Sequence, residues 1–355
     1  MIILPEKLSR MTPYDPSEDI YQIKLDANES FFSLPDELRD AIAASIDTID
    51  FNRYPDPSVD GLRRLAGREF RVAPGNIVVG NGSDELISLI MNTFAPRGGK
   101  VMVLSPDFSM YQFYAEVAEL DVVNLLKDGE FMLTEQEVIA RAQREKPDIL
   151  IFSNPCNPGG QGFAHAETVR ICHALEDVLV VVDEAYMDFW DQSILDVSTA
   201  LENVLVMKTL SKAYGCAALR CGFVIGYAAL IEQLNKTRSP YNVGSLVQMA
   251  ASIVLEDTAW QKAQCAAIVA RKEELEQACT ALAEESGAFT VLPTHTNFVV
   301  LRTPRCGEIF EQLKARSICV RCFPKYEMLR ITTGSAEENA QLLAELKDIC
   351  AGMQV

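Results

Sequence analysis

The sequence predicts an α/β protein in which a large domain, built on a mainly parallel sheet covered by helices, is followed by a smaller α/β C-terminal domain. Short apolar runs alternate with helix-length amphipathic segments as far as about residue 238. The apolar runs are continuous, which is typical of parallel strands buried on both faces. After Ser239 a long charged helical stretch replaces this alternation. We therefore predict an N-terminal arm at 1–40, a large domain at 41–238 and a small domain at 239–355.

Each predicted element follows from the length and polarity of its segment. In the large domain, the expected strand and helix pairs are 76–82 with 83–95, 100–106 with 108–120, and 148–155 with 167–176, followed by strands at 178–186, 203–210 and 220–227. In the small domain, we expect a helix at 258–285, a strand region at 289–302, a helix at 308–317, strands at 318–323 and 328–334, and a last helix at 336–350. Functional sites of such sheets lie beyond the carboxyl ends of the strands.

The composition favours small-molecule chemistry. A formal charge of −18 without a basic stripe disfavours nucleic acid and anionic membranes as partners. No run reaches the ~18 apolar residues of a spanning helix, and the first residues lack the pattern of a secretory signal, so we expect a cytoplasmic protein. The ten cysteines are scattered along the sequence, which indicates reduced thiols rather than a framework of disulfides. The single CxxC, at Cys319 and Cys322, has no second pair or histidine cluster, so we predict no metal site.

The stretch GNGSDELI (80–87) joins a strand, a glycine turn and the start of a helix. Backbone N–H groups of Ser83 and Asp84 would point at an anion there. Glu85 stands where the dinucleotide fingerprint has its third glycine, and no P-loop Gly-Lys-Ser/Thr follows. A phosphate-binding turn and an ordinary capped helix start both stay open from this stretch alone.

Two further strand ends deliver polar groups to the same edge of the predicted sheet. The stretch SNPCNPGGQ (153–161) holds two Asn-Pro pairs, which form a turn and leave the amides of Asn154 and Asn157 facing a cleft, although a tight loop alone also explains them. Asp183 ends a fully apolar strand, where burial would neutralise a carboxylate that lacks a partner. A structural ion pair or a helix cap would also supply that partner.

Lys212 has an unusual setting, because nothing else between Thr209 and Leu219 is charged. The hydroxyls of Thr209 and Ser211, together with Arg220 and a helix N-terminus, are the groups that form a phosphate cup. A desolvated lysine beside such a cup suits use as a nucleophile, and the alternative is a lysine at the edge of the core. A phosphate, an aldehyde that condenses with an amine and a ring nitrogen that binds a carboxylate would together use every group named so far. Pyridoxal phosphate carries all three.

The chain resembles the fold type I pyridoxal-phosphate aminotransferases and, within them, the histidinol-phosphate aminotransferases. The motifs that carry the resemblance run over nearly the whole length in the order of the family: TPYDPS, LDANES, RYPDP, GNGSDELI, SPDFSMY, SNPCNPGG, VVVDEAYMDF, KTLSKAYG, LRCGF and LRITTGSAEEN. The resemblance implies a homodimer with shared active sites. It also implies ping-pong transfer of the amino group of histidinol phosphate to 2-oxoglutarate, in histidine biosynthesis.

The same resemblance implies the roles of single residues. Lys212 would hold the cofactor covalently and move the Cα proton, Asp183 would keep the pyridine nitrogen protonated, and Phe108 would stack on the ring. Asn157 and Tyr186 would hydrogen-bond the phenolic oxygen of the ring. The groups expected at the cofactor phosphate are Ser83, Asp84, Thr209, Ser211, Arg220 and, from a second subunit, Tyr54. The groups expected at the substrates are Arg330 on an α-carboxylate, as in glutamate, Asn28 in the same pocket, and Arg321, Tyr14 and Tyr111 on the phosphate of histidinol phosphate.

The chain departs from the family pattern at a few positions that bear on the substrate. Phe108 replaces the usual tyrosine, Cys156 stands where asparagine is commoner, and the segment 321–330 is shorter than in many members. A phosphothreonine-type decarboxylase and an aminotransferase for aromatic or other amino acids therefore stay open. An alternative from a different functional class is a regulatory module that binds the cofactor without catalysing a reaction. A dehydrogenase is disfavoured by the missing third glycine.

Overall fold

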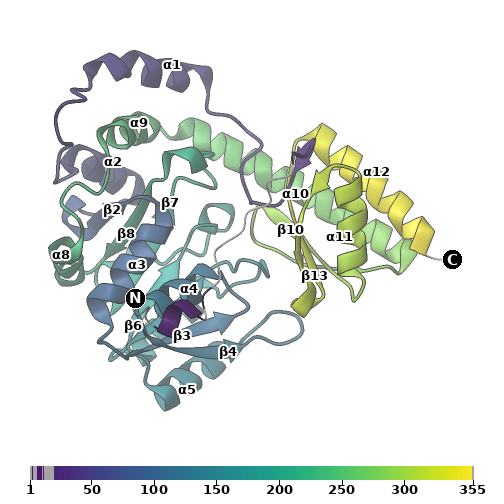
Figure 1. The fold of residues 1–355 in the computed structure, drawn as a ribbon, viewed down its shortest axis with the longest axis horizontal. Helices are drawn as coiled ribbons and strands as arrows, with labels where there is room; N and C mark the ends of the chain where they lie inside the picture. Colours follow the sequence, from purple (N-terminus) through teal and green to yellow (C-terminus); the bar gives the residue numbers. More distant parts are fainter. Residues whose placement is uncertain (1, 3–5, 10, 12–19, 354–355) are drawn as a thin grey trace.

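A computed structural model describes residues 2, 6–9, 11 and 20–353, and in this region the chain forms a larger and a smaller part (Figure 1). The larger part contains a seven-stranded sheet. Its strands, in spatial order, are β2 (Ile77–Gly80), β8 (Gly222–Gly226), β7 (Val204–Thr209), β6 (Leu179–Asp183), β5 (Ile149–Ser153), β3 (Lys100–Ser105) and β4 (Asp121–Leu126). Strand β8 is antiparallel to both its neighbours and the other pairs are parallel, so the predicted mainly parallel sheet is confirmed.

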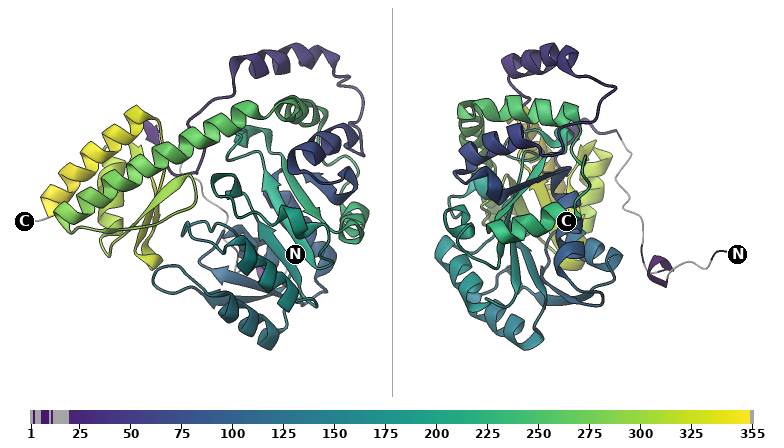
Figure 2. Two further views of the ribbon diagram at one scale, coloured as in Figure 1. Left: turned by 180° about the vertical axis from the view of Figure 1, so that it is seen from behind. Right: turned by 90° about the vertical axis from the view of Figure 1, so that its left-hand side faces the viewer.

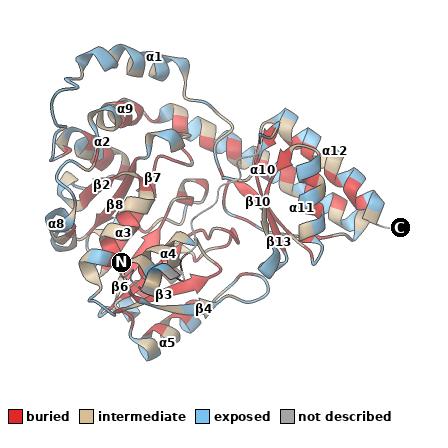
Figure 3. Cartoon of the chain, in the orientation of Figure 1, coloured by how far each residue is buried: buried red, intermediate tan, exposed pale blue. Residues whose placement is uncertain are grey.

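Both faces of this sheet are covered, so its inner strands β8, β7 and β5 are buried along their whole length (Figure 3). In β6, Val181 packs on one side with Ile90, whereas Val180 and Val182 pack on the other with Ile171. The edge strand β4 is only partly buried, and the sequence analysis did not predict a strand there. The helices of this part are α2 (Asp60–Phe70), α3 (Gly82–Phe94), α4 (Met110–Val117), α5 (Glu135–Glu145), α6 (His165–Ala174), α7 (Leu195–Ser198), α8 (Ala228–Thr237) and α9 (Ser245–Glu256).

The smaller part contains an antiparallel sheet in the order β12 (Arg321–Phe323), β13 (Met328–Thr332), β10 (Phe298–Arg302) and β9 (Thr290–Leu292). Its helices are α10 (Ala259–Ser286), α11 (Cys306–Ala315) and α12 (Ala336–Met353). The expected strand 318–323 is divided. Its first residues form β11 (Ile318–Cys319), which pairs in parallel with β1 (Ile23–Lys24). The N-terminal segment is thereby attached to the smaller part before it enters the larger one.

The long helix α10 links the two parts (Figure 2). Cys265 and Ile268 in its first half pack with Tyr186 of the larger part, and Leu275 and Leu282 in its second half belong to the core of the smaller part. Helix α9 packs on α2 and on α1 (Asp36–Ser45), which lies outside the sheets and buries no residue. We therefore propose that the small domain begins at α10 and not at residue 239, where the sequence led us to expect it. Among the described residues, no helix combines the length and the apolar character that a membrane span requires.

Candidate active site

A cavity of about 480 Å³ opens between the two parts, beyond the carboxyl ends of β5, β6 and β7. This volume lies within the ordinary range of small-molecule sites. The cavity brings together residues from the N-terminal segment, the large sheet and the small sheet. The predicted site residues that line it are Asn28, Ser83, Asp84, Phe108, Tyr111, Asn157, Asp183, Tyr186, Thr209, Ser211, Lys212, Arg220, Arg321 and Arg330.

Among the described residues, one predicted site residue, Tyr54, does not line this cavity. Tyr54 is 80% exposed and stacks on Tyr241, with 4.6 Å between the ring centres. A side chain that serves a second subunit has to be exposed in a single chain, so the predicted role of Tyr54 stays a prediction. Tyr14 lies outside the described residues.

Lys212 lies three residues beyond the end of β7 and points at the N-terminal segment. Its Nζ donates a hydrogen bond to the carbonyl oxygen of Ala27 at 2.8 Å and lies 5.8 Å from the centre of the Tyr186 ring. Within the part of the chain that the structure describes, Lys212 forms no ion pair with a carboxylate. A neutral carbonyl therefore holds the amine at the cavity wall, where it can react with a ligand.

Asp183 ends β6 and is only 4% exposed. Its two oxygens accept hydrogen bonds from the Tyr111 hydroxyl at 2.8 Å and from the Ala185 N–H at 3.0 Å. Burial raises the pKa of Asp183 to about 6, although both hydrogen bonds act in the opposite direction. A carboxylate in this position favours a cationic ligand group, because a nearby positive charge offsets the cost of burying the ionised form.

Tyr111 lies elsewhere than the sequence led us to expect. It is fully buried, and its hydroxyl donates to Asp183 rather than facing the far end of the cavity. Burial, with the neighbouring charge of Asp183, raises the pKa of the Tyr111 phenol well above its ordinary value, so the phenol keeps its proton. The prediction that Tyr111 binds a substrate phosphate does not fit this placement, because its one hydroxyl hydrogen is already used.

The start of α3 forms an anion cup. Gly82 has a φ of +74°, and a Cβ atom there would come within 2.6 Å of the Arg220 guanidinium, so glycine provides the space for this arginine. Arg220 donates to Asp84 at 2.9 Å. The Thr209 hydroxyl donates to Ser211 Oγ at 3.0 Å and accepts from the Ser211 N–H at 3.1 Å. An arginine, two hydroxyls and a helix N-terminus suit a phosphate group.

The small sheet supplies two arginines to the opposite wall. Arg321 and Arg330 are directly opposite each other in the antiparallel pair of β12 and β13, so their side chains lie on one face. Arg330 donates to the side-chain oxygen of Asn157 and to the Asp26 carbonyl. The side chain of Arg321 makes no hydrogen bond or ion pair with any described residue. Like charges opposite each other are unfavourable, so this pair indicates an anionic ligand.

Asn28 is held in place by both parts of the molecule. It is 1% exposed with a φ of 54°, a left-handed conformation that asparagine tolerates. Its Nδ2 donates to the Tyr186 hydroxyl at 2.8 Å, and its backbone N–H donates to Thr332 Oγ1 at 2.9 Å. The N-terminal segment thus orients Tyr186 at the cavity wall.

Our sequence predictions missed Asp107 and Ser153, which also line the cavity. Asp107 follows the apolar strand β3 by two residues, and Ser153 is the last residue of β5. A carboxylate just beyond an apolar strand is the signal that identified Asp183. It was present for Asp107 as well.

Comparisons with known proteins agree with this geometry. The family model for aminotransferase class I and II matches residues 20–346. The histidinol-phosphate aminotransferase of Clostridium novyi is 37% identical over 94% of this chain and 94% of its own length, and that of Chromobacterium violaceum is 38% identical over 92% and 91%.

Solved structures share the fold. The histidinol-phosphate aminotransferase from Sinorhizobium meliloti, solved in complex with pyridoxal-5'-phosphate, superposes with a TM-score of 0.85 at 24% identity, covering 94% of this chain and 92% of that one. The L-threonine-O-3-phosphate decarboxylase from Porphyromonas gingivalis superposes with a TM-score of 0.80 at 21% identity, over 92% and 99%. At these identities the structural likeness shows the fold alone.

Proposed function

Because the chain belongs to the class I and II aminotransferases, we propose that it transfers the amino group of histidinol phosphate to 2-oxoglutarate, giving imidazole-acetol phosphate and glutamate in histidine biosynthesis. The observation that carries the choice of substrate is that relatives matching nearly the whole chain at 32–38% identity are histidinol-phosphate aminotransferases. The opposed arginines of the small sheet support it, since the proposed substrates carry a phosphate or carboxylates.

The cavity has the donor set that pyridoxal phosphate requires. Lys212 offers an amine for the aldehyde, Asp183 a carboxylate for the ring nitrogen, and the cup at the start of α3 a place for the phosphate. Phe108 lines the cavity for stacking, and the Asn157 and Tyr186 side chains can bind the phenolic oxygen. The raised pKa of Asp183 supports the fit, because a protonated ring nitrogen supplies the missing positive charge. When bound, this cofactor acts as an electron sink for charge that develops on the substrate.

The residues of the chain then divide the remaining work. The Lys212 amine would take the proton from the substrate Cα and deliver it to the cofactor's aldehyde carbon within the same half-reaction, and the second half would reverse this proton transfer. Asp183, held by the Tyr111 hydroxyl and the Ala185 N–H, keeps the ring nitrogen protonated. Arg330 binds the α-carboxylate of glutamate, and the Asn157 oxygen and Asp26 carbonyl orient its guanidinium.

Arg321 tests the choice of substrate. Arg321→Ala should lower kcat/KM for histidinol phosphate, which corresponds to an increase of roughly 2–3 kcal/mol in the activation free energy, as the loss of a charge-assisted contact does. The same change should lower kcat/KM for phenylalanine much less. Arg330→Ala should impair the glutamate half-reaction more than Arg321→Ala does. Single-turnover loss of the cofactor's visible band, followed with histidinol phosphate, glutamate, aromatic amino acids and phosphothreonine, measures these effects.

A matched control for this series is Arg316→Ala. Arg316 also lies in the smaller part but pairs with Glu345 and Asp348 away from the cavity, so its loss should leave all half-reactions unchanged. Should histidinol phosphate react no faster than an aromatic amino acid, the general aminotransferase takes the place of our proposal. Release of CO₂ from phosphothreonine would favour the decarboxylase instead.

We also propose a homodimer in which Tyr54 completes the site of the partner. The exposed, stacked pair of Tyr54 and Tyr241 supports this, as do Phe51 and Leu246, which are close to them in sequence and exposed as well. Exposed apolar side chains of this kind mark interaction surfaces, and a two-fold pair is the commonest assembly. All ten cysteines are free, which agrees with the proposed cytoplasmic location.

Mixing two impaired variants tests the shared site. Tyr54→Ala should weaken the cofactor phosphate contact and lower activity, and Lys212→Ala should be inactive. A mixed dimer of the two has one pocket with an intact Lys212 that receives Tyr54 from its partner, so mixing should raise activity above the sum of the two variants measured separately. If Tyr54 served its own pocket, mixing would give no increase. Light scattering that finds only monomers of the active enzyme would also rule out the proposal.

A further inference from the structure

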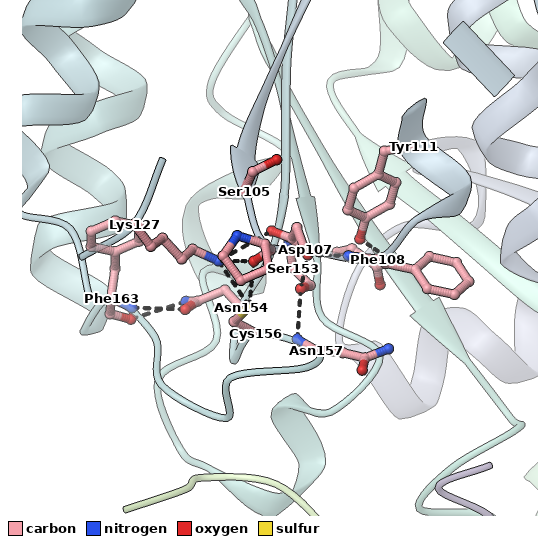
Figure 4. A network of polar contacts seen from close by, with 12 residues as sticks. Ser105, Asp107, Phe108, Tyr111, Lys127, Ser153, Asn154, Cys156, Asn157 and Phe163 are labelled. Carbon is pink, nitrogen blue, oxygen red and sulfur yellow. Dashed lines mark hydrogen bonds and ion pairs between the residues drawn. The ribbon is translucent and has the colours of Figure 1, made fainter. Parts of the chain in front are cut away.

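A second buried carboxylate beside the cavity has no role in the chemistry described so far. The Asp107 side chain is fully buried, and both of its carboxylate oxygens accept hydrogen bonds. One oxygen accepts the Phe108 N–H at 2.8 Å and the Ser153 hydroxyl, and the other accepts the Ser153 N–H at 3.2 Å (Figure 4). Asp107 therefore ties the loop after β3 to the end of β5.

These bonds reach two residues that the proposed function places around the cofactor ring. Phe108 is joined to Asp107 directly through its backbone N–H. Asn157 is joined through one intermediate, since its N–H donates to Ser153 Oγ at 3.0 Å. In Figure 4 the Phe108 ring and the Asn157 amide extend from this network on the side away from Lys127. A change at Asp107 would therefore act on both residues together.

Lys127 compensates the charge of Asp107. Its Nζ lies 3.6 Å from the Asp107 carboxylate, and the lysine side chain is only 6% exposed. The same Nζ donates to the Pro106 carbonyl at 2.9 Å and to the sulfur of Cys156 at 2.8 Å. Buried charges persist when they are paired and their hydrogen bonds are satisfied. The unusual Cys156 thus has a structural partner, as an acceptor for Lys127.

We propose that Asp107 is a positioning residue for the cofactor ring, which fixes the spacing of Phe108 and Asn157 and depends on Lys127 as its counter-charge. The inference rests on the proposed function, because it concerns the residues expected at pyridoxal phosphate. Asp107 itself takes no part in proton transfer. Its effect is on how firmly and in what orientation the ring is held.

The test uses the full-length holoenzyme with Asp107→Asn, which keeps the shape of the side chain and removes its charge. Loss of these charge-assisted bonds should speed the release of pyridoxal phosphate on dilution by about tenfold. The circular dichroism of the cofactor's visible band should also fall, because this signal depends on the orientation of the ring. We expect kcat to decrease while KM for the amino donor changes by less than about twofold.

Lys127 is tested by a double-mutant cycle. Lys127→Met alone leaves Asp107 buried and unpaired, so it should disturb cofactor release at least as much as Asp107→Asn. The double variant Asp107→Asn with Lys127→Met should be no worse than Asp107→Asn alone, because the two groups act as one unit. If Asp107→Asn does not fold, the double variant, which leaves neither charge buried, provides the measurement.

Lys272→Met is the matched control. Lys272 is also buried and paired, with Glu276 at 2.8 Å, but it does not line the cavity. Its loss should lower Tm and leave the dichroism and the release of the cofactor unchanged. If Asp107→Asn behaves in the same way, Asp107 is merely structural and the inference is wrong. A wild-type protein that binds no pyridoxal phosphate would instead refute the proposed function itself.

Discussion

Lys212→Ala should no longer bind pyridoxal phosphate covalently, and its transamination rate should fall by about 10²–10⁴-fold. Only a primary amine at this position can condense with the aldehyde and carry the Cα proton. The Nζ of Lys212 is held by a neutral carbonyl oxygen and not by a carboxylate, so no ion pair needs to break before it reacts. The measurements are the yellow colour of the purified protein and single-turnover rates with glutamate.

Lys212→Arg is the matched control for charge. The guanidinium keeps the positive charge but neither condenses nor releases a proton at neutral pH, so this variant should be as inactive as Lys212→Ala. Borohydride reduction of the wild-type protein, followed by peptide mapping, should place the cofactor on Lys212. A cofactor fixed to a different lysine, or to none, would overturn the central assignment.

Asp183→Asn should raise the barrier of the chemical step by about 2–4 kcal/mol, the cost of losing one preorganised electrostatic contact. The buried carboxylate is the group expected to keep the ring nitrogen protonated. Asparagine keeps the shape and can still accept one hydrogen bond, from Tyr111 or Ala185, so folding should survive. Single-turnover rates near those of the wild type would refute the electrostatic role of Asp183.

Although Asp183→Asn should slow the reaction, it should make the cofactor-free protein more stable relative to wild type as the pH rises. The folded pKa of Asp183, about 6, lies above the ordinary value of 3.8. Protonated Asp183 therefore stabilises the fold below pH about 4, and this contribution is lost as the pH rises through about 6. Asparagine does not titrate, so the stability of Asp183→Asn relative to wild type should increase by about 1 kcal/mol between about pH 5 and about pH 7.5. Thermal melts of both proteins at the two pH values measure the shift.

The strands and the residues that follow them could be predicted because the signals are local. A continuous apolar run predicts a buried parallel strand, and a polar residue at its end lies at the edge where sites form. Asp183 and Lys212 were found in this way, and the structure places both at one cavity. The edge strand β4 lacked such a run and was missed.

Local signals do not say which partner a side chain meets. Tyr111 follows Phe108 by three residues, and only the packing of α4 against the sheet directs its hydroxyl to Asp183, 72 residues away in sequence. The pairing of Arg321 with Arg330 depends on the register of two strands. No local pattern predicts such a register where, as here, it involves a three-residue strand.

The sequence by itself determined the α/β class and the family, and it predicted the residues at the strand ends that we propose bind the cofactor, because each depends on residues close together in the chain. The tertiary structure alone decided that Asn28 crosses from the N-terminal segment to orient Tyr186, and that Asp107 is paired with Lys127 behind the cavity wall. The physical reason is burial. A buried polar group must find a partner, and the fold, not the chain's order, determines which partner is within reach.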